Sequence, residues 1–84
     1  MTKRQIKETR VLEELQNADP DFQVTINEKI QWGAPCIKGT RIQAAGIAMM
    51  HANGDSIKSL MTLYDLTEKQ VRDAILFYKK IKGS

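Results

Sequence analysis

The second half of the chain carries three apolar stripes with helical spacing, separated by short turns. The first stripe runs over residues 42–53, the second over 57–64 and the third over 71–81. Within each stripe the apolar residues recur every three or four positions, which places them on one side of a helix. They are Ile42, Gly46, Ile47, Met49 and Met50, then Ile57, Leu60, Met61 and Tyr64, then Val71, Ala74, Ile75 and Tyr78. The pattern predicts three helices that pack through these faces.

Short capping sequences mark where these helices begin and end. Asn53 followed by Gly54 is a typical helix end, and Ser56 can cap the helix that comes next. Thr67, followed three residues later by Gln70, fits a capping box. The turn between the last two helices is therefore short, as in a helix-turn-helix. We expect a mainly α fold built on a homeodomain-like three-helix unit.

The N-terminal segment predicts one further helix. Residues 3–17 have helical spacing, but their apolar stripe is thin, its members being Ile6, Leu12 and Leu15. We expect this helix to lean on the domain, or on another chain, rather than to form the core. The chain then divides into a helical extension, residues 1–20, and a helix-turn-helix domain, residues 21–84.

A small β element is expected between the extension and the three helices. Residues 22–26 alternate apolar and polar side chains and include β-branched residues, which is typical of a short half-buried strand. Residues 35–37 form a second extended piece, and the two can pair as a hairpin over 22–38. A hairpin alone is marginally stable, so it must pack on helices, on a second copy or on a partner.

The size of the chain and its few reactive side chains limit the chemistry it can perform. With 84 residues it supports one small core and no deep substrate cleft. Its one cysteine, Cys36, excludes an internal disulfide, and its one histidine, His51, leaves no pair for a zinc site. A Cys36–His51 catalytic pair is disfavoured, since nothing near Cys36 in the sequence activates a thiol. We expect no enzymatic activity, no metal and no cofactor.

The remaining compositional features concern location and charge. No secretory signal and no apolar run long enough to cross a bilayer is found, so we expect a cytoplasmic, reduced protein with no membrane contact. The net charge is +3. The positive excess is concentrated after Leu66, where the sequence has five basic residues and two acidic ones. This concentration favours an anionic partner there, or simply a solubilising surface.

The basic residues of the last helix lie off its apolar stripe, together with Asp73 and Leu76. If this helix enters a major groove, Lys69, Gln70 and Arg72 near its N-terminus can reach base edges. The basic residues toward its C-terminus would then contact phosphates, namely Lys79, Lys80 and Lys82. The alternative is a solvated amphipathic helix, which the acidic residues Glu68 and Asp73 favour.

A ten-residue motif precedes the three helices. Residues 33–42 read Gly-Ala-Pro-Cys-Ile-Lys-Gly-Thr-Arg-Ile, which resembles the pattern G-x-P-x-I-x-G-T-R-I of domain-of-unknown-function family 433. The family continues with a helix, a Gly, a short helix ending in Tyr, then Leu-Thr and a final helix. The corresponding residues here are Gly54, Ser56-Ile57, Tyr64, Leu66-Thr67 and residues 71–78. The chain departs from the family at Gln43-Ala44, where Pro-Val is common, and at Asp65, where Pro is common.

The resemblance implies a homeodomain-like fold preceded by a small β element. It also implies an antitoxin role in a prokaryotic toxin–antitoxin operon, beside a toxin with a PIN-like nuclease fold. An antitoxin of this kind is expected to form a homodimer, bind operator DNA and repress its own operon. The alternative is a protein-interaction module that masks a partner without binding DNA.

Four residues of the motif region are candidates for partner binding or for a structural role. Gly39 permits a positive φ in a turn, and Thr40 can cap the helix that follows. Arg41 either holds an anionic partner or fastens the turn to its own domain. Trp32 is expected as a core or interface anchor.

Overall fold

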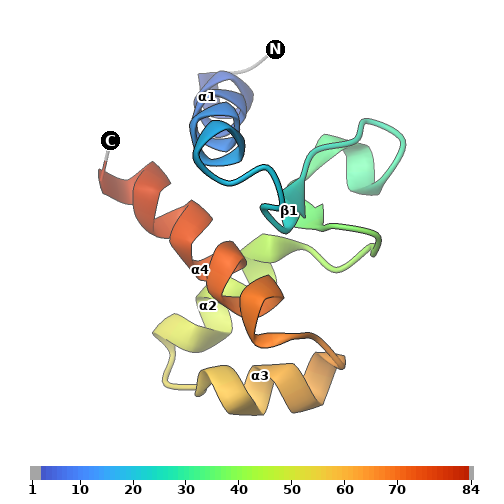
Figure 1. Ribbon diagram of the computed structural model, residues 1–84, viewed down its shortest axis with the longest axis vertical. Coiled ribbons are helices and arrows are strands. Elements are labelled where there is room, and N and C mark those ends of the chain that lie inside the picture. The colour runs from blue at the N-terminus through green and yellow to red at the C-terminus, as the bar shows by residue number, and fades with distance from the viewer. Residues whose placement is uncertain (1–2, 84) are drawn as a thin grey trace.

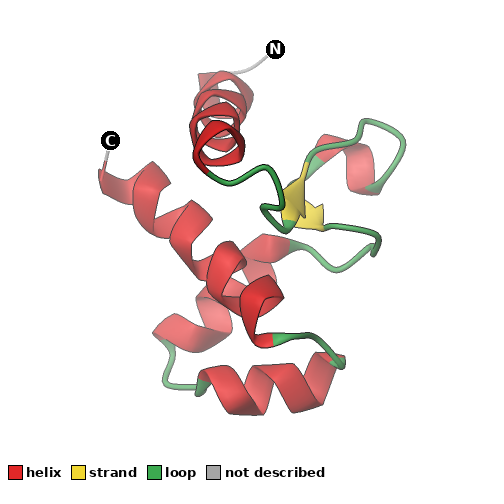
Figure 2. Cartoon of the chain, viewed as in Figure 1, coloured by secondary structure: helices red, strands yellow, loops and turns green. Residues whose placement is uncertain are grey.

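The computed structural model describes the backbone of residues 3–83 and the side chains of residues 7–83 (Figure 1). Its helices are α1 (Lys3–Ala18), α2 (Ala44–Ala52), α3 (Ile57–Tyr64) and α4 (Glu68–Gly83). A two-stranded antiparallel sheet pairs β1 (Val24–Thr25) with β2 (Cys36–Ile37), and the short 3-10 helix η1 (Gln31–Gly33) lies in the loop between them (Figure 2). The described chain is therefore mainly α, with an N-terminal helix and a small β element, as predicted.

Helix α4 lies at the centre of the fold and packs against α1, α2, α3 and β1 (Figure 1). Because it has neighbours on several sides, it buries more than the one predicted stripe. Val71, Ala74 and Phe77 are fully buried, although Phe77 falls outside that stripe. The expectation that Asp73 lies on the solvent-exposed side of α4 is wrong. Asp73 is 7% exposed, because the chain leading into β1 packs over it.

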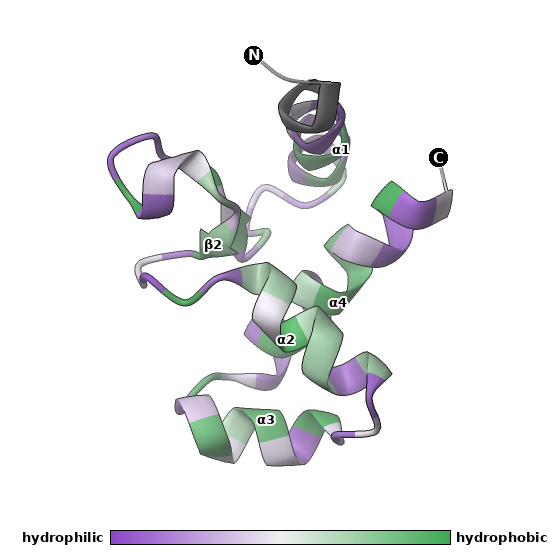
Figure 3. Cartoon of the chain, turned by 180° about the vertical axis from the view of Figure 1, so that it is seen from behind, coloured by the Kyte–Doolittle hydropathy of each residue, from purple (hydrophilic) through white to green (hydrophobic). Residues whose placement is uncertain are grey.

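Helices α2 and α3 supply the rest of the three-helix core. Ala44 and Ile47 from α2 and Leu60 from α3 are fully buried. Seen from behind, the hydrophobic residues of α2 and α4 gather where the two helices cross (Figure 3). Met49 is an exception to the predicted stripe, since it is 64% exposed.

The hairpin is shorter than the alternation of side chains predicts. Val24 pairs with Ile37 and Thr25 pairs with Cys36, and both Val24 and Ile37 are fully buried. Phe22 is also buried, but its N–H donates to the carbonyl of Asp19 in a turn instead of joining the sheet. Contact between β1 and α4 supplies the packing that so small a sheet needs.

Helix α2 begins at Ala44, two residues later than Ile42, where the apolar spacing places its start. The delay arises because Ile42 and Ala44 bond back to the hairpin: the Ile42 carbonyl accepts from the N–H of Ile37, and the Ala44 N–H donates to Pro35. Thr40 does not cap α2. Its hydroxyl donates to the Ile37 carbonyl and accepts from the N–H of Ile42, which closes the turn before the helix.

Helix α1 packs against α4. Val11, Leu12 and Leu15 are buried and join the same hydrophobic cluster as the three-helix unit. The predicted stripe included Ile6, whose side chain lies outside the described residues. The helix leans on the domain, but the expectation that it does not form the core is wrong, because Val11, Leu12 and Leu15 belong to the common hydrophobic cluster.

Candidate nucleic-acid interface

A tight turn connects α3 to α4. Asp65 takes a left-handed conformation, with φ 55° and ψ 49°, and its N–H donates to the Met61 carbonyl, which ends α3. The N–H of Thr67 donates to Oε1 of Gln70 over 2.9 Å, while the N–H of Gln70 donates to the Thr67 hydroxyl over 3.2 Å. The predicted capping box is confirmed, and it fixes the direction in which α4 leaves the turn. Helices α3 and α4 therefore have the connection of a helix-turn-helix.

The solvent side of α4 forms a basic face, which consists of Arg72, Leu76, Lys79, Lys80 and Lys82. These residues are all exposed, and the first four recur at helical spacing along one side of α4. Leu76, at its middle, is 46% exposed. A helix with such a face can lie against a polyanion without exposing its core.

Lys69 takes part in a partly exposed charge cluster with Asp19 and Asp73. Its ammonium donates to Oδ2 of Asp19, after the end of α1, and to Oδ2 of Asp73 over 3.2 Å. The hydrogen bond to Asp19 is the main cause that raises the pKa of Lys69, and the same bond lowers the pKa of Asp19. Asp73 also accepts from the N–H of Gln23 over 2.9 Å. Lys69 thus ties α4 to the end of α1 and to the chain before β1.

Two residues of the basic face make ion pairs at the surface. Nε of Arg72 lies 3.4 Å from Glu68, one turn earlier on α4, and Nζ of Lys80 lies 3.6 Å from Glu14 of α1. The side chains of Arg72 and Glu68 are each 61% exposed. Exposed pairs of this kind contribute little energy, so the pair with Glu68 does not prevent Arg72 from binding a stronger anion.

Lys79 and Lys82 make no ion pair with any side chain that the structure describes. They line a shallow hollow between α2 and α4 together with His51. A neighbouring hollow is lined by His51, Arg72, Leu76 and Lys79, and also by the acidic residue Asp73. The basic face therefore continues across a groove to the last turn of α2.

His51 was not among the predicted DNA-binding residues. Its Nδ1 lies 3.0 Å from the carbonyl of Asp55, so the ring bridges the turn between α2 and α3. The sequence shows that His51 lies in the last turn of α2. Its proximity to α4 depends on how the two helices cross, which the sequence does not show.

The six predicted DNA-binding residues thus fall into two groups. Lys69 and Gln70 bond to other groups of the same chain, the first in the charge cluster and the second in the capping box. The other four lie on the basic face: Arg72, Lys79, Lys80 and Lys82. The residues placed to meet a polyanion are therefore those of the middle and C-terminal end of α4.

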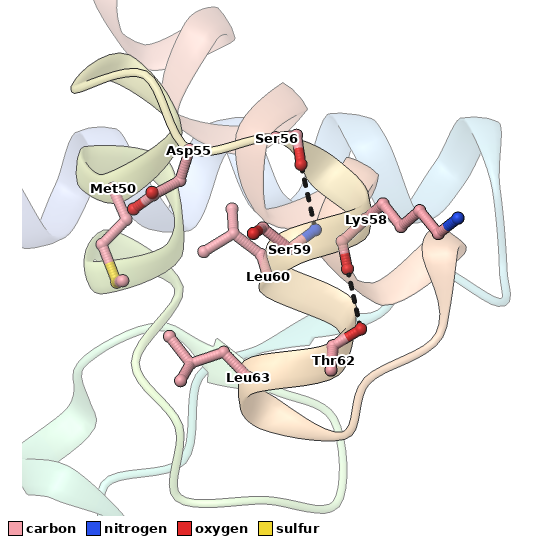
Figure 4. A pocket seen from close by; sticks show the side chains of 8 residues that line it. All are labelled: Met50, Asp55, Ser56, Lys58, Ser59, Leu60, Thr62 and Leu63. Carbon is pink, nitrogen blue, oxygen red and sulfur yellow. Dashed lines mark hydrogen bonds between the residues drawn. The ribbon is translucent and has the colours of Figure 1, made fainter.

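A further hollow lies between α2 and α3, away from the basic face (Figure 4). Met50, Leu60 and Leu63 form its apolar part, and Leu63 is 64% exposed. Side-chain hydrogen bonds of α3 border it, from the N–H of Ser59 to the Ser56 hydroxyl and from the Thr62 hydroxyl to the Lys58 carbonyl. The first of these bonds confirms Ser56 as the N-cap of α3.

The motif residues lie at the hairpin end of the molecule. Gly39 has φ 77°, which explains the glycine in this turn. Arg41 is exposed and makes no hydrogen bond or ion pair within the described part of the chain. Trp32 is 89% exposed and adds nothing to the core. The turn is fastened by Thr40 instead of by Arg41.

Cys36, the cysteine of the disfavoured catalytic pair with His51, lies in β2. Cys36 is 3% exposed, and burial raises the pKa of its thiol, whereas a nucleophile needs a lowered one. Among the side chains that the structure describes, no three or more His, Cys, Asp or Glu residues form a group that could hold a metal ion. None of the described helices has the length and apolar character required to span a bilayer.

Comparison with known proteins identifies the family through the hairpin and the three-helix unit. The model of the family described as protein of unknown function (DUF433) matches residues 24–78. The chain belongs to this family. No curated protein and no solved structure matches it significantly. The matched region of this DUF433 protein begins with β1 and ends within α4, so α1 lies outside it.

Proposed function

We propose that this DUF433 protein is an antitoxin-like DNA-binding protein of a prokaryotic toxin–antitoxin system. In this role it represses its own operon and neutralises a PIN-like toxin. The resemblance of its ten-residue motif supports the antitoxin part. One structural observation carries the DNA-binding part: the second helix of a helix-turn-helix presents Arg72, Lys79 and Lys82 to solvent.

The proposed binding mode places α4 along a major groove. Arg72 lies nearest the N-terminus of the basic face and would reach base edges, because a guanidinium can bind guanine with two hydrogen bonds. Lys79, Lys80 and Lys82 would contact phosphates, which position the protein without reading sequence. As a homodimer, the protein would bind two half-sites about one helical turn, or ~34 Å, apart.

The first prediction concerns the salt dependence of this binding. In a gel shift with the protein's own upstream DNA, the double variant Lys79→Ala/Lys82→Ala should bind more weakly than the wild type. Log K falls with log salt, and each lost phosphate contact makes this negative slope shallower by about 0.9, so the slope of the double variant should be shallower by about two units.

A matched control separates this effect from a general loss of charge. The variant Lys29→Ala/Lys38→Ala removes the same charge from exposed positions around the hairpin and should keep the wild-type slope. Absence of salt-sensitive binding by the wild type would refute the DNA-binding function. Equal slopes for the two double variants would refute the placement of the interface on α4.

A second candidate function is a protein-interaction module that masks its partner without binding DNA. The ion pairs of Lys69, Arg72 and Lys80 favour it, because they reduce the charge that α4 offers to a polyanion. The product of the neighbouring open reading frame distinguishes the two. Binding of that product, with no binding to upstream DNA, would select the interaction module.

A further inference from the structure

The hairpin end of the molecule presents a tryptophan in an unusual position. Trp32 is 89% exposed, although an exposed indole loses the favourable burial that this side chain normally contributes. Its backbone has φ 55°, that of Gln31 before it φ 50°, and that of Gly33 after it φ 81°. Two consecutive non-glycine residues with positive φ are unfavourable, and such strain concentrates at sites of function.

A set of local hydrogen bonds holds this conformation. Asn27 accepts two of these bonds. Its Oδ1 accepts from the N–H of Lys29 and its carbonyl accepts from the N–H of Ile30, each over 2.9 Å. The N–H of Gly33 then donates to Ile30 over 3.1 Å. The backbone is therefore held on both sides of Trp32, so a partner would have to order only the side chain and not the loop.

The turn that carries Arg41 is fixed beside this loop. Nε2 of Gln43 donates to Oε1 of Gln31 over 3.4 Å, and Gln43 also forms a bridge with Cys36 of β2. Both loops extend to the same side of the molecule, away from α1 and the C-terminal end of α4 (Figures 1 and 3). Trp32 and Arg41 are thus exposed on two connected loops, and these residue types dominate the energetics of many protein interfaces.

The charges on these loops indicate the kind of partner. Lys29, Lys38 and Arg41 are exposed together with the single acid Glu28, and none of the four makes an ion pair with the described side chains. A second copy docked through the same surface would bring two positive surfaces together, which is unfavourable. An acidic partner is attracted instead.

A protein partner fits these loops better than a nucleic acid does. Nucleic acid stacked on an aromatic side chain is normally followed by a basic groove along its backbone. Two hollows lined by basic residues lie between α2 and α4, and Trp32 lines neither of them. A protruding indole with a basic surround instead matches an apolar pocket edged by carboxylates.

We propose that residues 27–34 and 38–43 form a docking surface for an acidic partner protein, with Trp32 filling an apolar pocket and Arg41 pairing with a carboxylate at its edge. The inference rests on the proposed function, because the partner it assigns to this surface is the toxin. It separates the two activities in space: toxin on the hairpin loops and DNA on α4.

The test measures binding of the full chain to the product of the neighbouring open reading frame by isothermal titration calorimetry. Trp32→Ala should weaken binding about thirtyfold or more, and Arg41→Gln about tenfold. Leu63→Ala is the matched control, since it removes an exposed apolar side chain from α3 and should leave affinity unchanged. Unchanged thermal unfolding would show that Trp32→Ala does not act through stability.

The possible failures are distinguishable. If the wild type binds the product and Trp32→Ala binds equally well, the docking surface is wrong and the proposed function stands. If the wild type does not bind the product, the toxin assignment and this inference fail together. If Trp32→Ala instead changes the sedimentation of the free protein or its DNA affinity, while leaving partner binding intact, the surface serves a second copy or nucleic acid and the proposal is overturned.

Discussion

At the scale of single residues, Asp73 shows how a charged side chain on the central helix becomes part of the core. Its carboxylate accepts from the backbone N–H of Gln23 and from the ammonium of Lys69, so its burial is compensated. A buried acid with two donors stabilises the connection between β1 and α4. Asp73 lines one of the hollows beside the basic face, and its repulsion of DNA is reduced because Lys69 compensates its charge.

We predict that Asp73→Ala destabilises the protein by about 1 kcal/mol, because it leaves the part-buried N–H of Gln23 without its acceptor. The free energy of unfolding in urea measures the effect. Asp73→Asn keeps an oxygen acceptor and should lose less. A cost below about 0.5 kcal/mol for Asp73→Ala would mean that the hydrogen bond from Gln23 contributes little to the fold.

The place of Asp73 could not be predicted from local spacing. On a helical wheel it lies off the apolar stripe, and its partner Gln23 is 50 positions away in the chain. The exposure of Trp32 is similar: an isolated tryptophan suggests an anchor, but the left-handed backbone that presents it is a property of the folded loop. Side chains whose environment depends on distant segments are those that sequence patterns misplace.

At the scale of elements, local signals were sufficient wherever the stabilising contacts are local. The capping box of α4 and the cap of α3 both form between residues three positions apart, and both are present where the sequence predicts them. The start of α2 was misplaced, because Ile42 and Ala44 bond to the hairpin. On α4, helical spacing predicts the exposed basic face, but the ion pair with Asp19 engages Lys69 elsewhere.

The capping box itself carries a prediction. Thr67→Ala removes the hydroxyl that accepts from the N–H of Gln70, which should cost about 1 kcal/mol and lower the melting temperature by about 4–8 °C. Thr67→Ser keeps the acceptor and should melt close to the wild type. A melting temperature for Thr67→Ala equal to that of Thr67→Ser would show that α4 begins without help from this hydroxyl.

At the scale of the whole molecule, one charge cluster joins three parts of the fold. Lys69 of α4 contacts Asp19, just after α1, and Asp73, which holds the chain before β1. The cluster therefore depends on tertiary structure and is lost on unfolding. Groups whose pKa differs between the folded and unfolded chain make stability depend on pH.

The direction of that dependence follows from the two shifts. The hydrogen bond from Lys69 lowers the pKa of Asp19, so its contribution is present above the ordinary carboxyl range, near pH 4, and is lost as pH falls through the lowered value. The hydrogen bond to Asp19 raises the pKa of Lys69, so that contribution is present below about pH 10.4 and is lost as pH rises through the raised value. Stability from this cluster should therefore be constant between about pH 5 and 9 and fall on either side.

Urea midpoints measured across this pH range test the prediction. Asp19→Asn should lower the midpoint near neutral pH and flatten the loss on acidification, because the variant has no carboxylate to protonate at this position. Asp55→Asn removes an exposed acid that makes no ion pair with the described residues and should keep the wild-type profile. Parallel acid profiles for the wild type and Asp19→Asn would mean that the contact between α4 and the end of α1 adds no stability, and that packing of Val11, Leu12 and Leu15 alone holds the N-terminal helix in place.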